Sequence, residues 1–121
     1  MALPTDAVAI AEPMDPTDLL PWEADMSSYL EDGQEIASYT LALYPDAALL
    51  GLSILSAAPR APVLLEDDSV IQFWLEVDPG HREDPAFSSA GLVAGILVTI
   101  ETNSVPLKRR QRTFAVTVRQ R

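Results

Sequence analysis

The only histidine of the chain, His81, stands beside three charged residues, Arg82, Glu83 and Asp84. An imidazole next to carboxylates can serve as a general base or as a metal ligand. A zinc site would need additional Cys or His ligands, and the sequence has no cysteine and no second histidine. Because connecting segments run over the surface, a solvated loop histidine explains the same residues without any chemistry.

Calcium is the metal that the acidic turns would suit best, because it takes oxygen ligands. Carboxylates gather at Glu66–Asp68 and again at Asp78, Glu83 and Asp84, on either side of an expected strand. The spacing of an EF-hand is missing. Calcium binding therefore stays an alternative, and we assign no metal ligands.

Other catalytic patterns are missing from the sequence as well. No serine stands in a nucleophile-elbow motif, and Gly91 and Gly95 lie in or beside an apolar run without the lysine of a phosphate-binding loop. A glycosidase needs two opposed carboxyl groups, but nothing in the spacing selects a pair among the 18 acidic residues. The sequence predicts no catalytic residues, no cofactor and no enzyme.

Charge is distributed unevenly along the chain. The first 59 residues hold ten carboxylates and no Lys or Arg, whereas the last 14 hold six basic residues and no acid. A net charge of −10, with one basic cluster at Lys108–Arg112, argues against nucleic acid as a partner. Such a chain can pair its two ends within one fold or with a neighbouring copy, or it can present two unlike surfaces to two partners.

Several classes of protein are excluded or disfavoured by composition. The absence of cysteine excludes disulfides and thiol chemistry. The longest apolar runs, Ala47–Ala58 and Gly91–Ile100, fall short of the ~20 residues of a membrane helix. The first six residues carry no cation, so we expect no secretory signal. We expect a soluble protein without membrane contact.

Residues 1–21 are predicted to form an extended arm. Pro4, Pro13, Pro16 and Pro21 all fall in this stretch, and each proline fixes its own φ and biases the residue before it toward extended backbone. The arm would be disordered or laid along another subunit, and a domain over 22–121 would follow it.

The domain is predicted to be all-β, a sandwich of short strands. Asp25 should cap a very short helical turn that ends at Gly33. Alternating or continuous apolar residues then predict strands over 37–43, 71–77, 92–101 and 113–119. The pattern leaves 47–55 open between a strand and a short helix, and 78–90 forms an unusually long loop.

Two tryptophans are candidate contacts for partners. Trp74 falls on the opposite face from Ile71, Phe73 and Leu75, so it is either a core residue of a second layer or an exposed anchor. Trp22 follows the arm directly and could pin it to the domain or to a neighbour.

Motifs along most of the chain resemble small phage virion proteins known as fiber-tail adaptors. The resemblance covers Asp15 to Arg119, with Met26 and Tyr29 standing where the family has tryptophans and with the loop 78–90 in place of a short Gly-Gly turn. It is carried by Asp15-Pro16, Leu20, Asp25-x-Ser27-x-Tyr29-Leu30-x-x-Gly33-x-x-Ile36-Ala37-Ser38, Phe73-Trp74-Leu75, Ile100-x-Thr102 and Arg109-Arg110-x-x-Thr113-Phe114-x-Val116-x-Val118.

The resemblance implies an immunoglobulin-like β-domain in the tail or neck of a virion, assembled in the host cytoplasm. Its expected partners are further copies of itself in a ring, tail or portal-associated proteins, and tail fibers. The expected partner-binding residues are Asp15, Pro16, Trp22, Trp74, Arg109 and Arg110. The alternative is a carbohydrate-binding or calcium-binding β-sandwich module for host attachment, suggested by the acidic turns and the two tryptophans.

Overall fold

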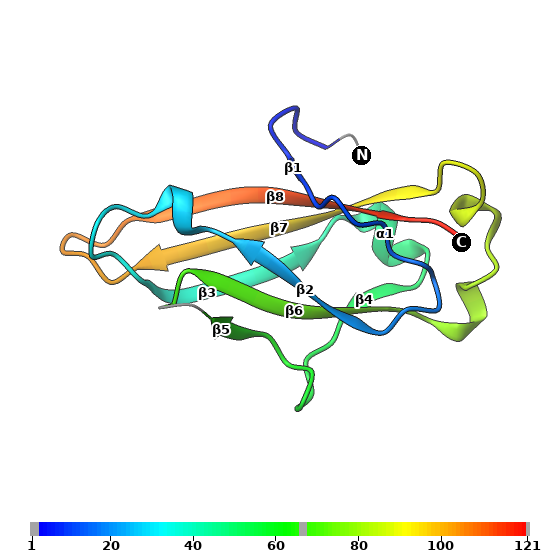
Figure 1. Cartoon of the computed structure of the whole chain (residues 1–121), viewed down its shortest axis with the longest axis horizontal. Coiled ribbons are helices and arrows are strands. Elements are labelled where there is room, and N and C mark those ends of the chain that lie inside the picture. Colours follow the sequence, from blue (N-terminus) through cyan, green and yellow to red (C-terminus); the bar gives the residue numbers. More distant parts are fainter. Residues whose placement is uncertain (1–2, 66–67, 121) are drawn as a thin grey trace.

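The computed structural model describes residues 3–65 and 68–120, which form two β-sheets and almost no helix (Figure 1). This confirms the all-β prediction. Sheet I has the strand order β1-β8-β7-β3, with bounds Val8–Ala9, Arg109–Val118, Leu92–Thr102 and Ile36–Leu43. Sheet II has the order β2-β6-β4, with β5 also paired to β6; the bounds are Leu20–Asp25, Val70–Val77, Leu52–Ile54 and Val63–Leu65.

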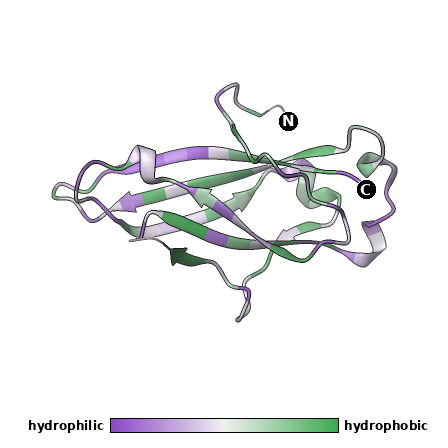
Figure 2. Ribbon diagram, viewed as in Figure 1, coloured by the Kyte–Doolittle hydropathy of each residue, from purple (hydrophilic) through white to green (hydrophobic). Residues whose placement is uncertain are grey.

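One hydrophobic core lies between the inner faces of the two sheets. In β6 the buried residues alternate with half-buried ones, as the pattern of the sequence predicts. In sheet I, β7 is central as predicted, and its Ile96 lies opposite Phe114 of β8 in antiparallel register. Figure 2 shows these strands as largely apolar, whereas β8 is hydrophilic over its first residues. Among the fully buried side chains of the core are Ile71, Phe73, Leu75, Val77, Ile96, Val98, Ile100, Val116 and Val118.

Strand β3 departs from the predicted alternation at its start. The register against β7 shifts between Ile36 and Ser38, so that Ala37 is the extra residue of a β-bulge. Ile36 is buried and Ala37 is exposed. The strand predicted over 37–43 thus begins one residue earlier, and the bulge turns Ile36 rather than Ala37 toward the core.

Residues 47–55, for which the sequence left a strand and a short helix open, contain the end of a helix followed by a strand. Helix α1 spans Pro45–Leu49 with Pro45 in its first turn, and β4 follows at Leu52. Gly51 joins them with a φ of +86°, a conformation that favours glycine.

The long loop between β6 and β7 is tied to the core. It contains two short 3₁₀ turns, η2 (Pro79–His81) and η3 (Pro85–Phe87), and Phe87 is fully buried. Asp84 caps η3 by accepting the amide hydrogen of Ala86, and the amide of Gln120 donates to the Phe87 carbonyl at 2.7 Å. The loop thus packs against the end of β8.

The described part of the predicted arm lies on the domain. Val8 pairs with Phe114 in the parallel β1–β8 contact, and further along Met14 bridges to Val118. Met14 is fully buried (0% exposed). The boundary predicted between residues 21 and 22 falls inside β2, so the described chain passes from one sheet to the other without a separate arm.

Within the described ranges no helix is both long and apolar enough to cross a membrane.

Candidate functional site: a basic strand edge and an apolar sheet face

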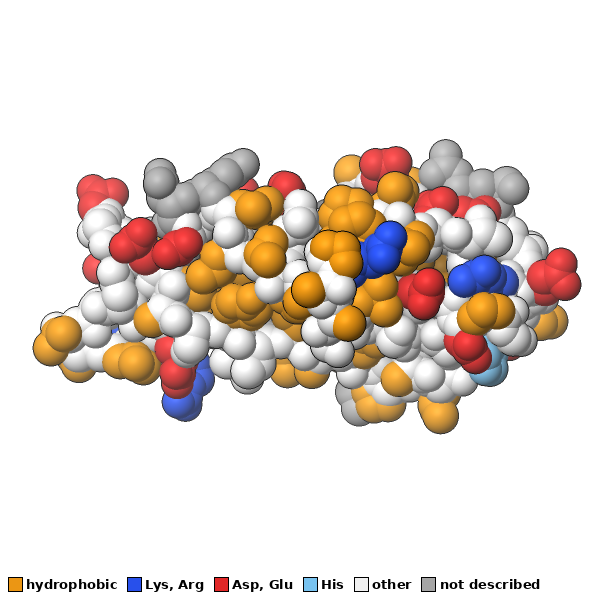
Figure 3. Space-filling view, turned by 90° about the horizontal axis from the view of Figure 1, so that it is seen from below, with side chains coloured by type: hydrophobic (Ala, Val, Ile, Leu, Met, Phe, Trp, Pro, Cys, Tyr) orange, Lys and Arg blue, Asp and Glu red, His pale blue; other side chains and the backbone are white. Residues whose placement is uncertain are grey.

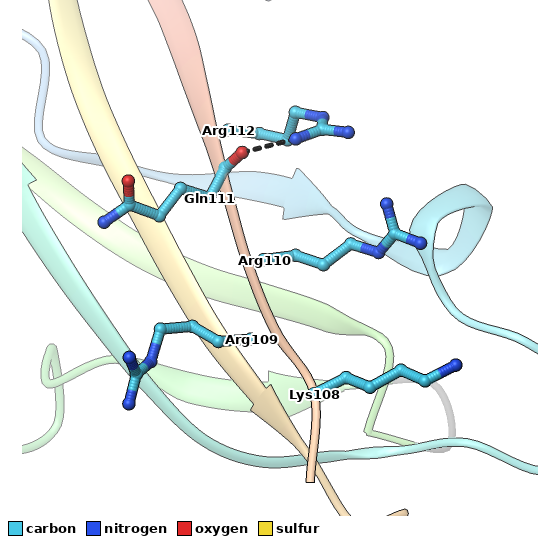
Figure 4. A pocket seen from close by; sticks show the side chains of 5 residues that line it. All are labelled: Lys108, Arg109, Arg110, Gln111 and Arg112. Carbon is cyan, nitrogen blue, oxygen red and sulfur yellow. Dashed lines mark hydrogen bonds between the residues drawn. The ribbon is translucent and has the colours of Figure 1, made fainter.

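The first part of β8 carries the basic cluster of the sequence. Successive side chains of a strand point to opposite faces, so Lys108, Arg110 and Arg112 extend to one side and Arg109 and Gln111 to the other (Figure 4). Together these five residues line an open hollow of about 780 Å³.

Two of the cations are neutralised by carboxylates of the same chain. Lys108 Nζ lies 2.5 Å from Glu31, and Arg109 Nη2 lies 2.6 Å from Glu101. The hydrogen bond and charge of Lys108 lower the pKa of Glu31, and hydrogen bonds from Arg109 and Ser38 lower the pKa of Glu101. The Glu31–Lys108 pair confirms that the acidic and basic parts of the chain meet within one fold.

The other two arginines are less engaged. Arg112 lies over the ring of Tyr29, with its ζ carbon 4.5 Å from the ring centroid, and donates to the Gln111 carbonyl at 2.6 Å. The Arg110 side chain is exposed and makes no hydrogen bond or ion pair with any residue that the structure describes. It contributes only a longer-range lowering of the Glu31 pKa. Arg110 is therefore the cation of this strand that is best placed to meet a partner.

One backbone edge of this basic segment has no partner strand in 3–65 or 68–120. β7 pairs with β8 along its whole length, from Arg109 to Val118. On the other edge, β1 pairs only with Phe114 and Ala115. An unpaired edge presents amide and carbonyl groups to another chain.

A second candidate surface lies on the outer face of sheet II. Trp74 is half-buried there, opposite Pro21 of β2, and the Arg60 guanidinium carbon lies 5.2 Å from the centroid of its ring. Val63 of β5 is 42% exposed on the adjacent strand. Figure 3, seen from the side of β5, shows apolar side chains gathered on the middle of this face. Trp74 is thus a surface residue of the domain, one of the two alternatives that the sequence left open.

The remaining predicted site residues lie elsewhere. Asp15 forms a turn, since one of its carboxylate oxygens accepts hydrogen bonds from the Thr17 amide at 2.8 Å and hydroxyl at 2.7 Å. Pro16 is buried in this turn, which leads from the β8 edge toward β2. Trp22 is 6% exposed, and its indole Nε1 has no hydrogen-bond partner among the described residues. The predicted residues therefore fall into separate places, and Arg109 and Arg110, although adjacent in β8, extend to opposite sides of the strand (Figure 4).

The candidate metal ligands are not assembled in the described structure. Glu66 and Asp67 lie outside the described residues. Within 3–65 and 68–120 no three side chains of the types that bind metals are grouped. His81 lies against Gly51, where an added Cβ would approach its ring to 2.7 Å, and its Nδ1 is 3.9 Å from Asp84.

Several residues of these surfaces were missed by sequence reasoning. The contact between Tyr29 and Arg112, and the contact between Arg60 and Trp74, join positions with no local pattern between them. The alternation along Lys108–Arg112 was readable, and it would have separated Arg110 and Arg112 from Arg109.

No model of a known protein family matches the sequence, and no curated protein resembles it closely enough to count as a relative.

Proposed function

We propose that this protein is a structural component of a phage virion, an adaptor in the tail or neck. It would join the tail machinery, meaning portal, tail adaptor or tube, to the tail fibers through protein–protein contacts, with an immunoglobulin-like domain as its scaffold. Copies of the chain would assemble in a ring after synthesis in the host cytoplasm.

The observation that carries the proposal is the presence of two unlike surfaces on the two sheets. Sheet I offers a basic strand segment with an unpaired edge at Arg109–Arg112. Sheet II offers an apolar face around Trp74 and Val63. An adaptor has to hold two different neighbours, and surfaces of different chemistry suit that task.

The resemblance to fiber-tail adaptors supports the same function, because its motifs fall on elements that build these surfaces. Phe73-Trp74-Leu75 lies on β6, where Trp74 faces outward, and Arg109-Arg110 begins β8. Asp15-Pro16 lies in the turn that leads from the β8 edge toward β2, with Pro16 buried and Asp15 half-buried, and it remains a proposed contact with a partner.

Carbohydrate binding is less well supported by the geometry. A sugar ring stacks on an open aromatic face, and the Arg60 guanidinium covers one face of Trp74 at 5.2 Å.

The test is incorporation into particles. A phage whose copy of the gene is deleted is complemented with the wild-type chain, with Arg110→Glu or with Trp74→Glu, and the protein in purified particles is quantified by mass spectrometry. We expect the wild-type chain in the particles at a fixed copy number and both variants to be depleted about tenfold or more.

Arg119→Glu provides the matched control, because it makes the same charge change at an exposed residue after the end of β8. Thermal unfolding of each purified variant separates misfolding from lost contacts. Purified particles without the wild-type protein would end the proposal.

A further inference from the structure

β8 extends beyond its contact with β1, from Phe114 back to Arg109. Alternate residues of this part direct their backbone N–H and C=O groups to the same edge that β1 occupies further along. The carbonyls of Ala115 and Thr117 accept hydrogen bonds from the amides of Ile10 and Met14, each at 2.8 Å. Alternate residues of a strand direct their N–H and C=O groups to the same edge. By this two-residue repeat, Gln111 and Arg109 direct theirs to the edge that β1 leaves unpaired.

A hydrogen bond within the strand agrees with this orientation. The Gln111 carbonyl accepts from the guanidinium of its neighbour Arg112 at 2.6 Å. The Arg112 guanidinium thus donates to a carbonyl that could otherwise accept a hydrogen bond from the backbone amide of an added strand. A surface side chain of this kind can rotate away when such a strand binds. The edge is therefore available at two successive hydrogen-bonding residues.

The side chains beside this edge are cationic and would favour a partner strand that carries negative charge. Arg110 and Arg112 are two residues apart and point to the same side of the strand (Figure 4). A strand added to the edge would place its own alternate side chains beside them. Carboxylates at positions i and i+2 of that strand would then meet both guanidinium groups.

We propose that the unpaired edge of β8 at Arg109 and Gln111 is a strand-addition site for an extended acidic segment of another protein. Main-chain hydrogen bonds would hold the segment, and alternate carboxylates facing Arg110 and Arg112 would give it specificity. The inference deepens the proposed function, because it names the chemistry of one partner of the adaptor.

Nucleic acid fits this edge less well than an acidic peptide. Lys108 and Arg109 are paired with Glu31 and Glu101, which leaves two arginines for phosphates. Each phosphate contact changes the slope of the logarithm of the binding constant against the logarithm of the salt concentration by about −0.9. A protein that makes only two such contacts therefore binds nucleic acid weakly.

A second copy of this chain is also a poorer occupant. Several of the carboxylates already accept hydrogen bonds within the chain, among them Asp15 from Thr17, Asp25 from Ser27 and Asp84 from Ala86.

The experiment titrates the ¹⁵N-labelled protein with an end-blocked octapeptide that alternates Glu and Thr. We expect the amide signals of Arg109 and Gln111 to shift and their hydrogen exchange to slow by about tenfold or more at saturation, because added strands protect edge amides. A peptide with Lys in place of Glu should not bind. An octapeptide that leaves both amides unprotected overturns the inference.

Two N-methylated forms of the peptide separate strand addition from simple charge attraction. In an antiparallel contact the Thr amides would face β8, and in a parallel contact the Glu amides would. We therefore expect one of the two methylated peptides to lose binding and the other to retain it. If neither methylation weakens binding, strand addition is wrong.

Protein variants complete the test. Arg110→Glu should weaken peptide binding about tenfold or more. Gln111→Pro should abolish it, because proline lacks the amide hydrogen that an added strand would use, and a strand accepts proline where its N–H faces an unpaired edge. Arg119→Glu should leave it unchanged. The choice of an acidic peptide as occupant would be overturned if a single-stranded oligonucleotide bound more tightly than the peptide. It would also be overturned if self-association protected both amides in the absence of peptide.

Failure here is distinguishable from failure of the adaptor proposal. The peptide titration uses the purified chain alone, whereas incorporation is measured in particles. A chain found in particles whose edge takes no peptide would remain an adaptor and lose this site.

Discussion

The guanidinium of Arg112 lies over the ring of Tyr29, with 4.5 Å between its ζ carbon and the ring centroid. Tyr29 ends the short turn η1 (Ser27–Tyr29), which follows β2 of sheet II, and Arg112 belongs to β8 of sheet I. The contact therefore joins the two sheets at the end of the domain that carries the basic segment.

A double-mutant cycle should detect this contact. We expect Tyr29→Leu and Arg112→Gln to be coupled by about 0.5–1 kcal/mol in the free energy of unfolding, the range of cation–π pairs at partly exposed sites. Urea denaturation of the single and double variants measures the coupling. Gln111→Ala is the control, because the Gln111 side chain extends to the other side of the strand, and it should show no coupling to Tyr29→Leu.

Phe87 should contribute strongly to stability although it lies in a loop. Its side chain is fully buried, so Phe87→Ala should lower the free energy of unfolding by about 3–5 kcal/mol through lost burial and the cavity left behind. Leu49→Ala, at a residue that is 78% exposed, should change it by less than about 0.5 kcal/mol. Equal effects of the two substitutions would contradict the packing of the loop.

Met14 provides the corresponding test for the N-terminal segment. Because its side chain is fully buried beside β8, Met14→Ala should cost about 2–5 kcal/mol of unfolding free energy. Val105→Ala, at a 98% exposed residue, serves as the comparison and should be nearly neutral. A segment that is free in the isolated chain would tolerate both substitutions.

The Glu31–Lys108 pair should make stability depend on pH in the acid range. Lys108 lowers the pKa of Glu31 below its usual value of 4.5, so the carboxylate stabilises the fold above pH 4.5. This contribution fades as the pH falls through the lowered pKa. The stability difference between wild type and Glu31→Gln should therefore shrink on acidification, as urea denaturation at several pH values would show.

Direct titration adds a control to that measurement. Lys108→Met should raise the pKa of Glu31 toward 4.5, followed by NMR of the side-chain carboxyl. The pKa of Glu101 should remain lowered in the same variant, because Arg109 and Ser38 hold it. A Glu31 pKa that does not respond to Lys108→Met would exclude the pair as its cause.

Features that depend on local chemistry were predictable from the sequence. The two-residue period identified β6 and β8, because one face of each strand is buried and the other is not. Asp25 accepts the Ser27 amide hydrogen at 2.9 Å, and Gly33 has the predicted positive φ of +80°. The N-cap of η1 is nevertheless Met26, and η1 ends at Tyr29, so the prediction that Asp25 caps a helical turn ending at Gly33 is wrong in its bounds. The features that were predicted correctly depend on groups that are neighbours in the chain.

The placement of the N-terminal segment and of the tryptophans was decided by tertiary structure. Prolines predict extended backbone in the N-terminal segment, but they do not specify the edge on which Met14 is buried. Trp22 and Trp74 are chemically identical, yet the register of β2 against β6 turns Trp22 into the core and Trp74 outward.

Some features of the basic segment at Lys108–Arg112 also follow from the sequence alone, whereas others depend on tertiary structure. The sequence alone determined that Lys108–Arg112 is basic and that its side chains alternate if it forms a strand. Only the folded chain brings Glu31 to Lys108, 77 positions away, and ends β1 short of Gln111. Contacts between distant residues depend on how the two sheets pack, and that packing is set by the whole core rather than by any one segment.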